Sequence, residues 1–153
     1  RLKSEGDRVL VLSDGEPSPI PFIRTEPYPG FPTDVQSQLM ATLCFSRGNS
    51  SIQETIFEGR FNTALELKKM GADIIIDNRL AVIHGAGNLH GALVEARDLR
   101  GGAALVIAGL AAEGKTHIDS CCHIFRGYAG IETDLRQLGA DIRADYGQAA
   151  QQA

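Results

Sequence analysis

Apolar residues recur every three or four positions in some segments of this chain and alternate with polar residues in others, a mixture that predicts both helices and strands. The first helix is expected to begin after Thr33, because Thr33 and Gln36 have the spacing of a capping box, and to end before Gly48. The apolar stripe of this helix consists of Val35, Leu39, Met40 and Leu43.

A strand is expected next, at residues 50–56, where polar and apolar side chains alternate. A second helix should follow Arg60 and end at Gly71, and residues 74–76 and 80–83 should form a hairpin. The residues that this second helix should bury are Phe61, Ala64 and Leu65.

The later half of the chain repeats this order. An almost wholly apolar helix is expected at residues 99–112, buried on nearly every side, followed by a break at Gly114 and a strand at residues 116–121. One more helix should then present a single apolar face, made of Tyr128, Ile131, Leu135 and Leu138.

Spacing indicates that the two halves are copies of one unit. The interval from Asp34 to Arg60 equals the interval from Arg100 to Arg126, and each copy places one arginine, Arg60 or Arg126, immediately before a predicted helix. Helix N-termini and guanidinium groups both favour anions, so the duplication predicts an anion site built by symmetry. At the other matched position the copies differ, because Asp34 in the first corresponds to Arg100 in the second.

These patterns predict the α/β (α+β) class and divide the chain into five segments. The segments are a leading strand with a proline-rich connector (1–32), a first repeat (33–84), a linker (85–96), a second repeat (97–145) and a polar tail (146–153). The leading strand, at residues 8–12, begins almost at once and no initiator methionine precedes it. We therefore expect a piece of a longer protein.

Composition narrows the class of protein. The chain has 153 residues, of which 43% are apolar and 22% charged, and its net charge of −4 argues against nucleic acid or an anionic membrane as a partner. Three cysteines, two of them adjacent, argue against a disulfide framework and favour the reducing cytoplasm. No apolar run reaches the roughly 18 residues of a membrane span.

The sequence offers little for a metal or a cofactor. Cys121, Cys122 and His123 are neighbours, but no second pair at ligand spacing accompanies them. We expect no metal and no cofactor, and interpret these cysteines as buried residues at the end of a strand.

Four short motifs occur in this chain in a characteristic order and spacing. They are Pro-Gly-Phe-Pro-Thr-Asp at 29–34, Glu-Thr-Ile-Phe-Glu-Gly-Arg-Phe at 54–61, Asp-Leu-Arg at 98–100 and Arg-Gly-Tyr at 126–128. Together they resemble the bacterial UDP-N-acetylglucosamine enolpyruvyl transferases. The similarity runs across essentially the whole chain but covers only the later part of that enzyme. The family usually has asparagine in place of Gly59 and commonly an acidic residue in place of Phe125.

The resemblance implies an inside-out α/β barrel, or prism, built from βαβαββ units, two of which match the repeats. It also implies a cleft between two domains that binds UDP-N-acetylglucosamine and phosphoenolpyruvate. There the enolpyruvyl group moves to the sugar 3-hydroxyl through a tetrahedral addition product and phosphate is released, which is the first committed step of peptidoglycan synthesis.

Residue roles follow from the same resemblance. Asp34 would be the general base for the sugar 3-hydroxyl, because a carboxylate within hydrogen-bond reach can take its proton. Arg100 and Arg126 would hold phosphoenolpyruvate, and Arg60 would line the nucleotide-sugar side of the cleft. The remaining substrate-binding positions are Ile56, through its backbone, and Phe57.

Each residue also has a purely structural explanation. An aspartate such as Asp34 suits the start of any helix, and Arg60 and Arg126 could be ordinary surface arginines. Ile56 and Phe57 could belong to the core at the end of a strand.

Two other functions stay open, namely a sister enzyme that acts on shikimate 3-phosphate and a non-catalytic anion-binding or interaction module. The motif at 29–34 favours the sugar nucleotide. We expect the isolated chain to be inactive, because the other wall of the cleft belongs to the missing N-terminal part of the enzyme. Two repeats without the rest of the prism would expose apolar surface and strand edges, so copies of this chain are expected to associate with one another. Arg100, at the start of an apolar helix, needs solvent or an anion, whereas Arg97 is expected to be solvated.

Overall fold

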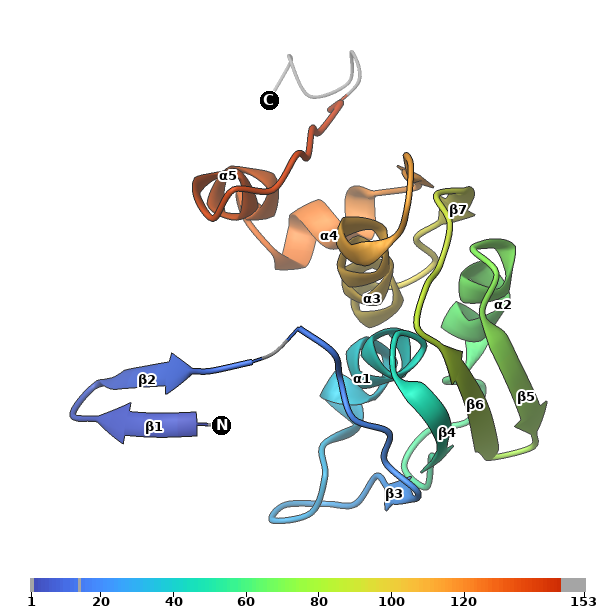
Figure 1. The fold of residues 1–153 in the computed structure, drawn as a ribbon. Coiled ribbons are helices and arrows are strands. Elements are labelled where there is room, and N and C mark those ends of the chain that lie inside the picture. The colour runs from blue at the N-terminus through green and yellow to red at the C-terminus, as the bar shows by residue number, and fades with distance from the viewer. Residues whose placement is uncertain (1, 14, 147–153) are drawn as a thin grey trace.

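A computed structural model describes residues 2–13 and 15–146 of the chain (Figure 1). The predicted polar tail therefore lies, from residue 147 onward, outside the described residues. Within them, no helix is long and apolar enough to cross a lipid bilayer.

The largest sheet in the described residues has four strands in the order β3-β4-β6-β5. Strand β3 runs parallel to β4, whereas β6 is antiparallel to both β4 and β5. Helices α1 and α2 connect these strands, so the chain order is strand, helix, strand, helix and hairpin, and the predicted hairpin is confirmed. The elements are β3 (Ile23–Arg24), α1 (Gln36–Leu43), β4 (Arg47–Gln53), α2 (Asn62–Lys69), β5 (Asp73–Asp77) and β6 (Leu80–Ala86).

The second copy repeats only part of this order. Strands β7 and β8 pair in parallel, and α3 connects them. Two short helices follow, and residues 138–146 form no hairpin. The elements are β7 (Leu93–Glu95), α3 (Leu99–Ala111), β8 (His117–Asp119), α4 (Cys122–Gly127) and α5 (Ile131–Gln137).

The single helix predicted around Tyr128 is wrong, because the chain forms two helices there. Helix α4 ends at Gly127, and Gly130, with φ +68°, precedes the first residue of α5. A left-handed backbone interrupts a right-handed helix, and glycine adopts it without a steric penalty. The spacing of the apolar residues predicted one continuous helix, because this spacing does not depend on where the backbone leaves the helical conformation.

The core lies where α1, α2 and α3 pack together against the sheet. Helix α3 contacts α1, α2 and α4, and Figure 1 shows it between α1 and α4. Burial on nearly every side was expected for α3, but Ile107 is 37% exposed and Leu110 43% exposed. The expectation is wrong because these neighbours cover only part of the helix surface.

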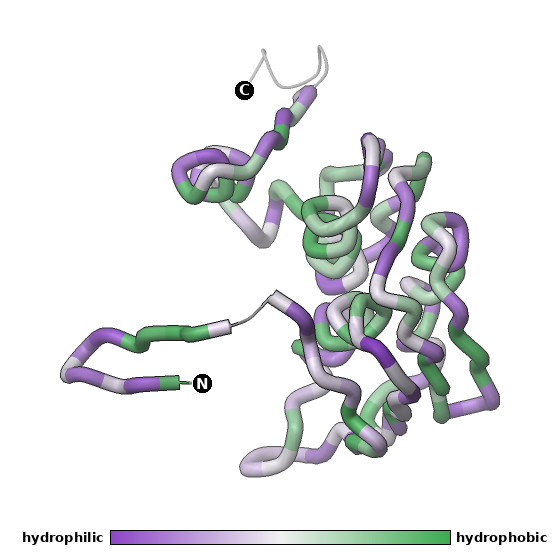
Figure 2. Tube along the Cα trace, in the orientation of Figure 1, coloured by the Kyte–Doolittle hydropathy of each residue, from purple (hydrophilic) through white to green (hydrophobic). Residues whose placement is uncertain are grey.

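The leading strand, β2 (Arg8–Val11), is confirmed and pairs with a strand that was not predicted, β1 (Leu2–Glu5). All residues of both strands are exposed. Figure 2 shows apolar residues along this hairpin, which stands apart from the rest of the chain in Figure 1.

Thr33 does not cap α1 as predicted. Residues Thr33–Val35 form a 3₁₀ turn before α1, and neither Pro32 before the turn nor Val35 before α1 makes a side-chain cap. The Thr33 hydroxyl instead donates to Glu54 at 2.9 Å, and Gln36 is completely buried. In a capping box the Thr33 hydroxyl would accept from a backbone N–H, but here it donates to a carboxylate, and this charge-assisted bond replaces the local one.

Candidate active site

Three predicted site residues meet at one point, although they lie far apart in sequence. Asp34 is in the 3₁₀ turn before α1, and Arg100 is in the first turn of α3. Arg100 Nε donates to Asp34 Oδ1 at 2.6 Å, and Arg60 Nη2 lies 3.5 Å from the same oxygen. The structure therefore places one carboxylate between two guanidinium groups, one from each copy.

Arg60 lies just before α2, as predicted, and its orientation is fixed by packing. Its guanidinium carbon is 4.7 Å from the centre of the Phe57 ring, a cation–π contact. The side chain is only 19% exposed, and its Nε is buried without a hydrogen-bond partner in the described residues. One donor of Arg60 is therefore unused.

Asp98 holds the first turn of α3, and with it Arg100. Its carboxylate accepts from the backbone N–H groups of Arg100 at 3.0 Å and Gly101 at 2.8 Å, which makes it the N-cap of the helix. A side chain at Gly101 would collide with Thr63 of α2, because an added Cβ would lie 2.6 Å from its hydroxyl. No role was predicted for Asp98, although aspartate before an apolar run is a known capping signal.

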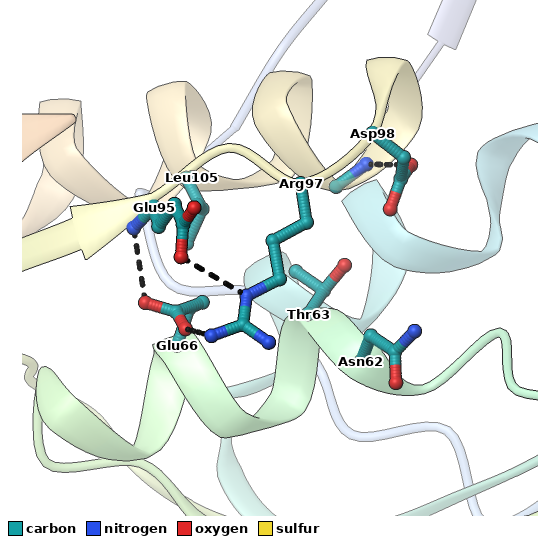
Figure 3. A pocket seen from close by; sticks show the side chains of 8 residues that line it. Asn62, Thr63, Glu66, Glu95, Arg97, Asp98 and Leu105 are labelled. Atoms are coloured by element: carbon teal, nitrogen blue, oxygen red, sulfur yellow. Dashed lines mark hydrogen bonds and ion pairs between the residues drawn. The ribbon is translucent and has the colours of Figure 1, made fainter. Parts of the chain in front are cut away.

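A second carboxylate that the sequence analysis missed, Glu66, ties α2 to the end of β7. Figure 3 shows it beside Arg97, and it accepts from the backbone N–H of Glu95 at 3.0 Å and from Lys69 at 2.6 Å. Burial raises the pKa of the Glu66 carboxyl, but the contacts with Lys69, Glu95 and Arg97 outweigh it and the net pKa is lowered.

Arg97 is therefore not simply solvated, as was expected. Its guanidinium pairs with Glu66 at 3.4 Å and with Glu95 at 3.3 Å while about half of the side chain stays exposed. The ion pair with Glu66 could not be predicted from the residues next to Arg97, because Glu66 lies in the segment predicted as the first repeat.

Arg126 does not join the cluster. It lies in the last turn of α4 and not before a helix, so its predicted position was wrong. The reason is that α4 begins earlier, at Cys122. The Arg126 side chain is exposed and has no ion pair or hydrogen bond within residues 2–13 and 15–146. Its neighbour Gly127 packs directly on Leu99, where an added Cβ would lie 2.3 Å from a methyl carbon, so Arg126 begins close to the first turn of α3.

Ile56 and Phe57 are exposed, so the alternative that they are core residues is wrong. They follow β4 on a loop whose backbone N–H groups donate to Glu54 Oε1 at 2.8 and 3.1 Å. This geometry leaves both side chains at the surface, with Phe57 against Arg60. Their contact with a substrate stays a prediction.

Gly59, which stands where the resembling family usually has asparagine, has φ +65°. Glycine and asparagine are the residues that most readily adopt this left-handed conformation. The substitution thus preserves the backbone path that leads into Arg60.

The cysteines differ from expectation because Cys121 and Cys122 lie at the start of α4 and not within a strand. Cys121 is half-buried and Cys122 exposed, whereas Cys44 is buried, which raises the pKa of its thiol to about 12. In the described part of the chain, no group of three or more histidine, cysteine and acidic side chains could hold a metal ion.

The ionisation of Asp34 should depend on Arg100. The hydrogen bond from Arg100 lowers the pKa of the Asp34 carboxyl, partial burial opposes it, and Arg60 adds a smaller lowering effect. The stabilisation from this ion pair is present at neutral pH and lost as the pH falls through the lowered pKa.

Arg100→Leu should therefore raise the pKa of Asp34, as measured by carboxyl-carbon NMR during a pH titration. Arg126→Leu, at an arginine with no ion pair in the described part of the chain, should leave it unchanged, and an equal shift in both variants would contradict this assignment.

Together these features define a mixed α/β protein in which one carboxylate, Asp34, lies between the guanidinium groups of Arg60 and Arg100. Comparison with known proteins narrows this class. Residues 3–146 match the family model described as EPSP synthase (3-phosphoshikimate 1-carboxyvinyltransferase). The chain therefore belongs to the EPSP synthase family of enolpyruvyl transferases.

Individual relatives carry more specific names. The UDP-N-acetylglucosamine 1-carboxyvinyltransferase of Desulfofundulus thermocisternus is 58% identical over 93% of this chain and 58% of its own length. The enzyme of the same name from Anaeromyxobacter sp. (strain Fw109-5) is 48% identical over 95% of this chain and 36% of its own length. This chain thus spans between about a third and three fifths of these relatives.

A solved structure agrees with the fold. The enolpyruvyl transferase NikO from Streptomyces tendae superimposes with a TM-score of 0.84 and 31% identity. The match covers 94% of this chain and 33% of that protein.

Proposed function

We propose that this chain forms part of an enzyme that moves the enolpyruvyl group of phosphoenolpyruvate to the 3-hydroxyl of UDP-N-acetylglucosamine. The observation that carries this proposal is the position of Asp34 between Arg60 and Arg100. The names of the two relatives support it, and so does the match to the family model. The reaction would take place in the cytoplasm and serve peptidoglycan synthesis.

The residues suit the chemistry of this transfer. Asp34 takes the proton of the 3-hydroxyl while that oxygen bonds to C2 of phosphoenolpyruvate, and the methylene carbon gains a proton. The resulting tetrahedral adduct then loses phosphate from C2 and a proton from the methyl carbon, which restores the double bond. Arg100 and Arg126 bind the anionic groups of phosphoenolpyruvate, and Arg60, Ile56 and Phe57 contact the sugar nucleotide.

Binding of phosphoenolpyruvate would also change Asp34. Without substrate, Arg100 holds the pKa of the Asp34 carboxyl below its ordinary value, so Asp34 is a weak base. An anion that takes Arg100 away would raise this pKa. Asp34 would then become a stronger base only after phosphoenolpyruvate has bound.

The proposed architecture is the prism built from βαβαββ units. The element order of residues 23–86 has this form, and the chain spans only part of its relatives. We propose that the other wall of the substrate cleft comes from a segment equivalent to the rest of those proteins. The isolated chain would then bind substrates weakly and not turn over.

The sister reaction on shikimate 3-phosphate is the less favoured alternative. The family model takes its name from that reaction, but relatives at 48% and 58% identity both carry the sugar-nucleotide name. A purely non-catalytic module is less favoured, because both relatives carry the name of an enzyme.

A chimera tests the proposed function. Residues 2–146 would replace the matching segment of the Anaeromyxobacter relative, and phosphate release would be measured with both substrates. We expect turnover with UDP-N-acetylglucosamine and none with shikimate 3-phosphate. The relative without its segment and this chain alone serve as controls and should be inactive. A chimera that folds but releases no more phosphate than the controls would contradict the proposal.

A further inference from the structure

Glu54 is a buried carboxylate that the proposed chemistry does not use. It directly follows β4 and is only 1% exposed. Its carboxylate accepts four hydrogen bonds, from the hydroxyls of Thr25 and Thr33, each at 2.9 Å, and from the backbone N–H groups of Ile56 at 2.8 Å and Phe57 at 3.1 Å. Its own backbone N–H donates to the backbone carbonyl of Arg79 at 2.8 Å, which fixes it to the turn directly before β6.

Two of these contacts lead directly to the candidate site. Thr33 immediately precedes Asp34 in the 3₁₀ turn, and Phe57 provides the ring that packs against Arg60. The Glu54 carboxylate therefore joins the segment that carries Asp34 to the loop that orients Arg60. The third partner, Thr25, is bonded to β4 through its backbone N–H, so the group is anchored to the sheet.

The chemistry of this position favours a carboxylate over other side chains. A carboxylate has about four lone-pair positions and can accept all four donors, whereas an amide oxygen has two. Burial raises the pKa of the Glu54 carboxyl, but the hydrogen bonds from Phe57, Ile56 and the two threonines outweigh it and lower the net pKa. Glu54 is thus charged at neutral pH.

We propose that Glu54 is a positioning residue that holds Asp34 and Arg60 in the geometry required for catalysis. It touches no substrate and acts through Thr33 and through the backbone of Phe57. What the positioned residues do rests on the function proposed above, but the positioning itself is a property of the chain without substrate.

Thr33 gives a sharper test than Glu54, because removing the buried carboxylate would leave four donors unsatisfied and unfold the chain. Thr33→Val removes only the hydroxyl that connects Glu54 to the Asp34 turn and keeps the shape of the side chain. Thr33→Ser keeps the hydroxyl and is the matched control. The readout is the pKa of Asp34 in the whole chain, measured by carboxyl-carbon NMR, with amide spectra to show that both variants are folded.

We expect Thr33→Val to raise the pKa of Asp34 toward its ordinary value, because the loosened turn weakens the contact with Arg100. Thr33→Ser should titrate like the unaltered chain. In the chimera, Thr33→Val should lower kcat by about 10- to 100-fold, as displacements of a catalytic group do, with a smaller change in KM.

Two results would overturn the inference, namely an unchanged pKa of Asp34 in Thr33→Val, or equal shifts in the valine and serine variants. These outcomes are separate from those of the proposed function. If the titrations behave as expected but the chimera is inactive, Glu54 positions Asp34 and the proposed function fails. If the chimera is active but the pKa does not respond, the function holds and the role of Glu54 fails.

Discussion

Asp34→Asn in the chimera is expected to lower kcat by about 10²- to 10⁴-fold, the usual range for loss of a general base. Asparagine has nearly the same shape and can still accept a hydrogen bond from Arg100, which now bonds to Asp34 at 2.6 Å. It cannot take the proton of the sugar 3-hydroxyl. Phosphate release at saturating UDP-N-acetylglucosamine and phosphoenolpyruvate measures the effect.

The matched control is Asp73→Asn. Asp73 is an exposed aspartate on β5, where it lies 3.0 Å from His84 and has no contact with Arg60 or Arg100. This variant should keep kcat within about twofold, because surface substitutions away from a site have small effects. If Asp34→Asn also retained full turnover, Asp34 would not be the base and its role would be limited to the ion pair.

Leu105→Ala is expected to lower the free energy of unfolding by about 2–5 kcal/mol, the range for a buried leucine truncated to alanine. Leu105 is 1% exposed on α3 and belongs to the main core. The lost methyl groups leave a cavity that the surrounding helices can fill only in part. Urea unfolding followed by circular dichroism measures the change.

Leu110→Ala, on the same helix, is the control for that experiment. Leu110 is 43% exposed, so its truncation removes less buried surface and should cost under about 1 kcal/mol. Equal losses for the two variants would mean that α3 does not pack as described.

The elements of the first copy could largely be predicted from sequence, because each depends on local signals. The turn between β5 and β6 and the start of α2 after Arg60 both agree with the expected pattern. Thr33 marks the limit of this approach. Its spacing from Gln36 fits a capping box, but its hydroxyl donates to Glu54, which is distant in sequence and directly follows β4. The spacing of nearby residues does not reveal a hydrogen-bond partner, such as Glu54, that comes close only when the chain folds.

The candidate site was predicted in part for the same reason. Family motifs led to Asp34, Arg60 and Arg100, and the structure brings these three together. Arg126 was expected at a helix start by symmetry with Arg60, but the second copy begins its helix earlier. The buried acids Glu54 and Glu66 were missed, because their partners come from segments that only the tertiary fold makes neighbours.

The contact between Asp34 and Arg100 also lies where the two copies meet. These residues occupy matched positions, Asp34 just before α1 and Arg100 in the first turn of α3, and the two helices pack against each other. If both copies kept the same residue, two carboxylates or two guanidinium groups would face each other at this contact and repel. The opposite charges at these matched positions therefore favour the contact between the start of α1 and the start of α3 over a contact between two like-charged ends.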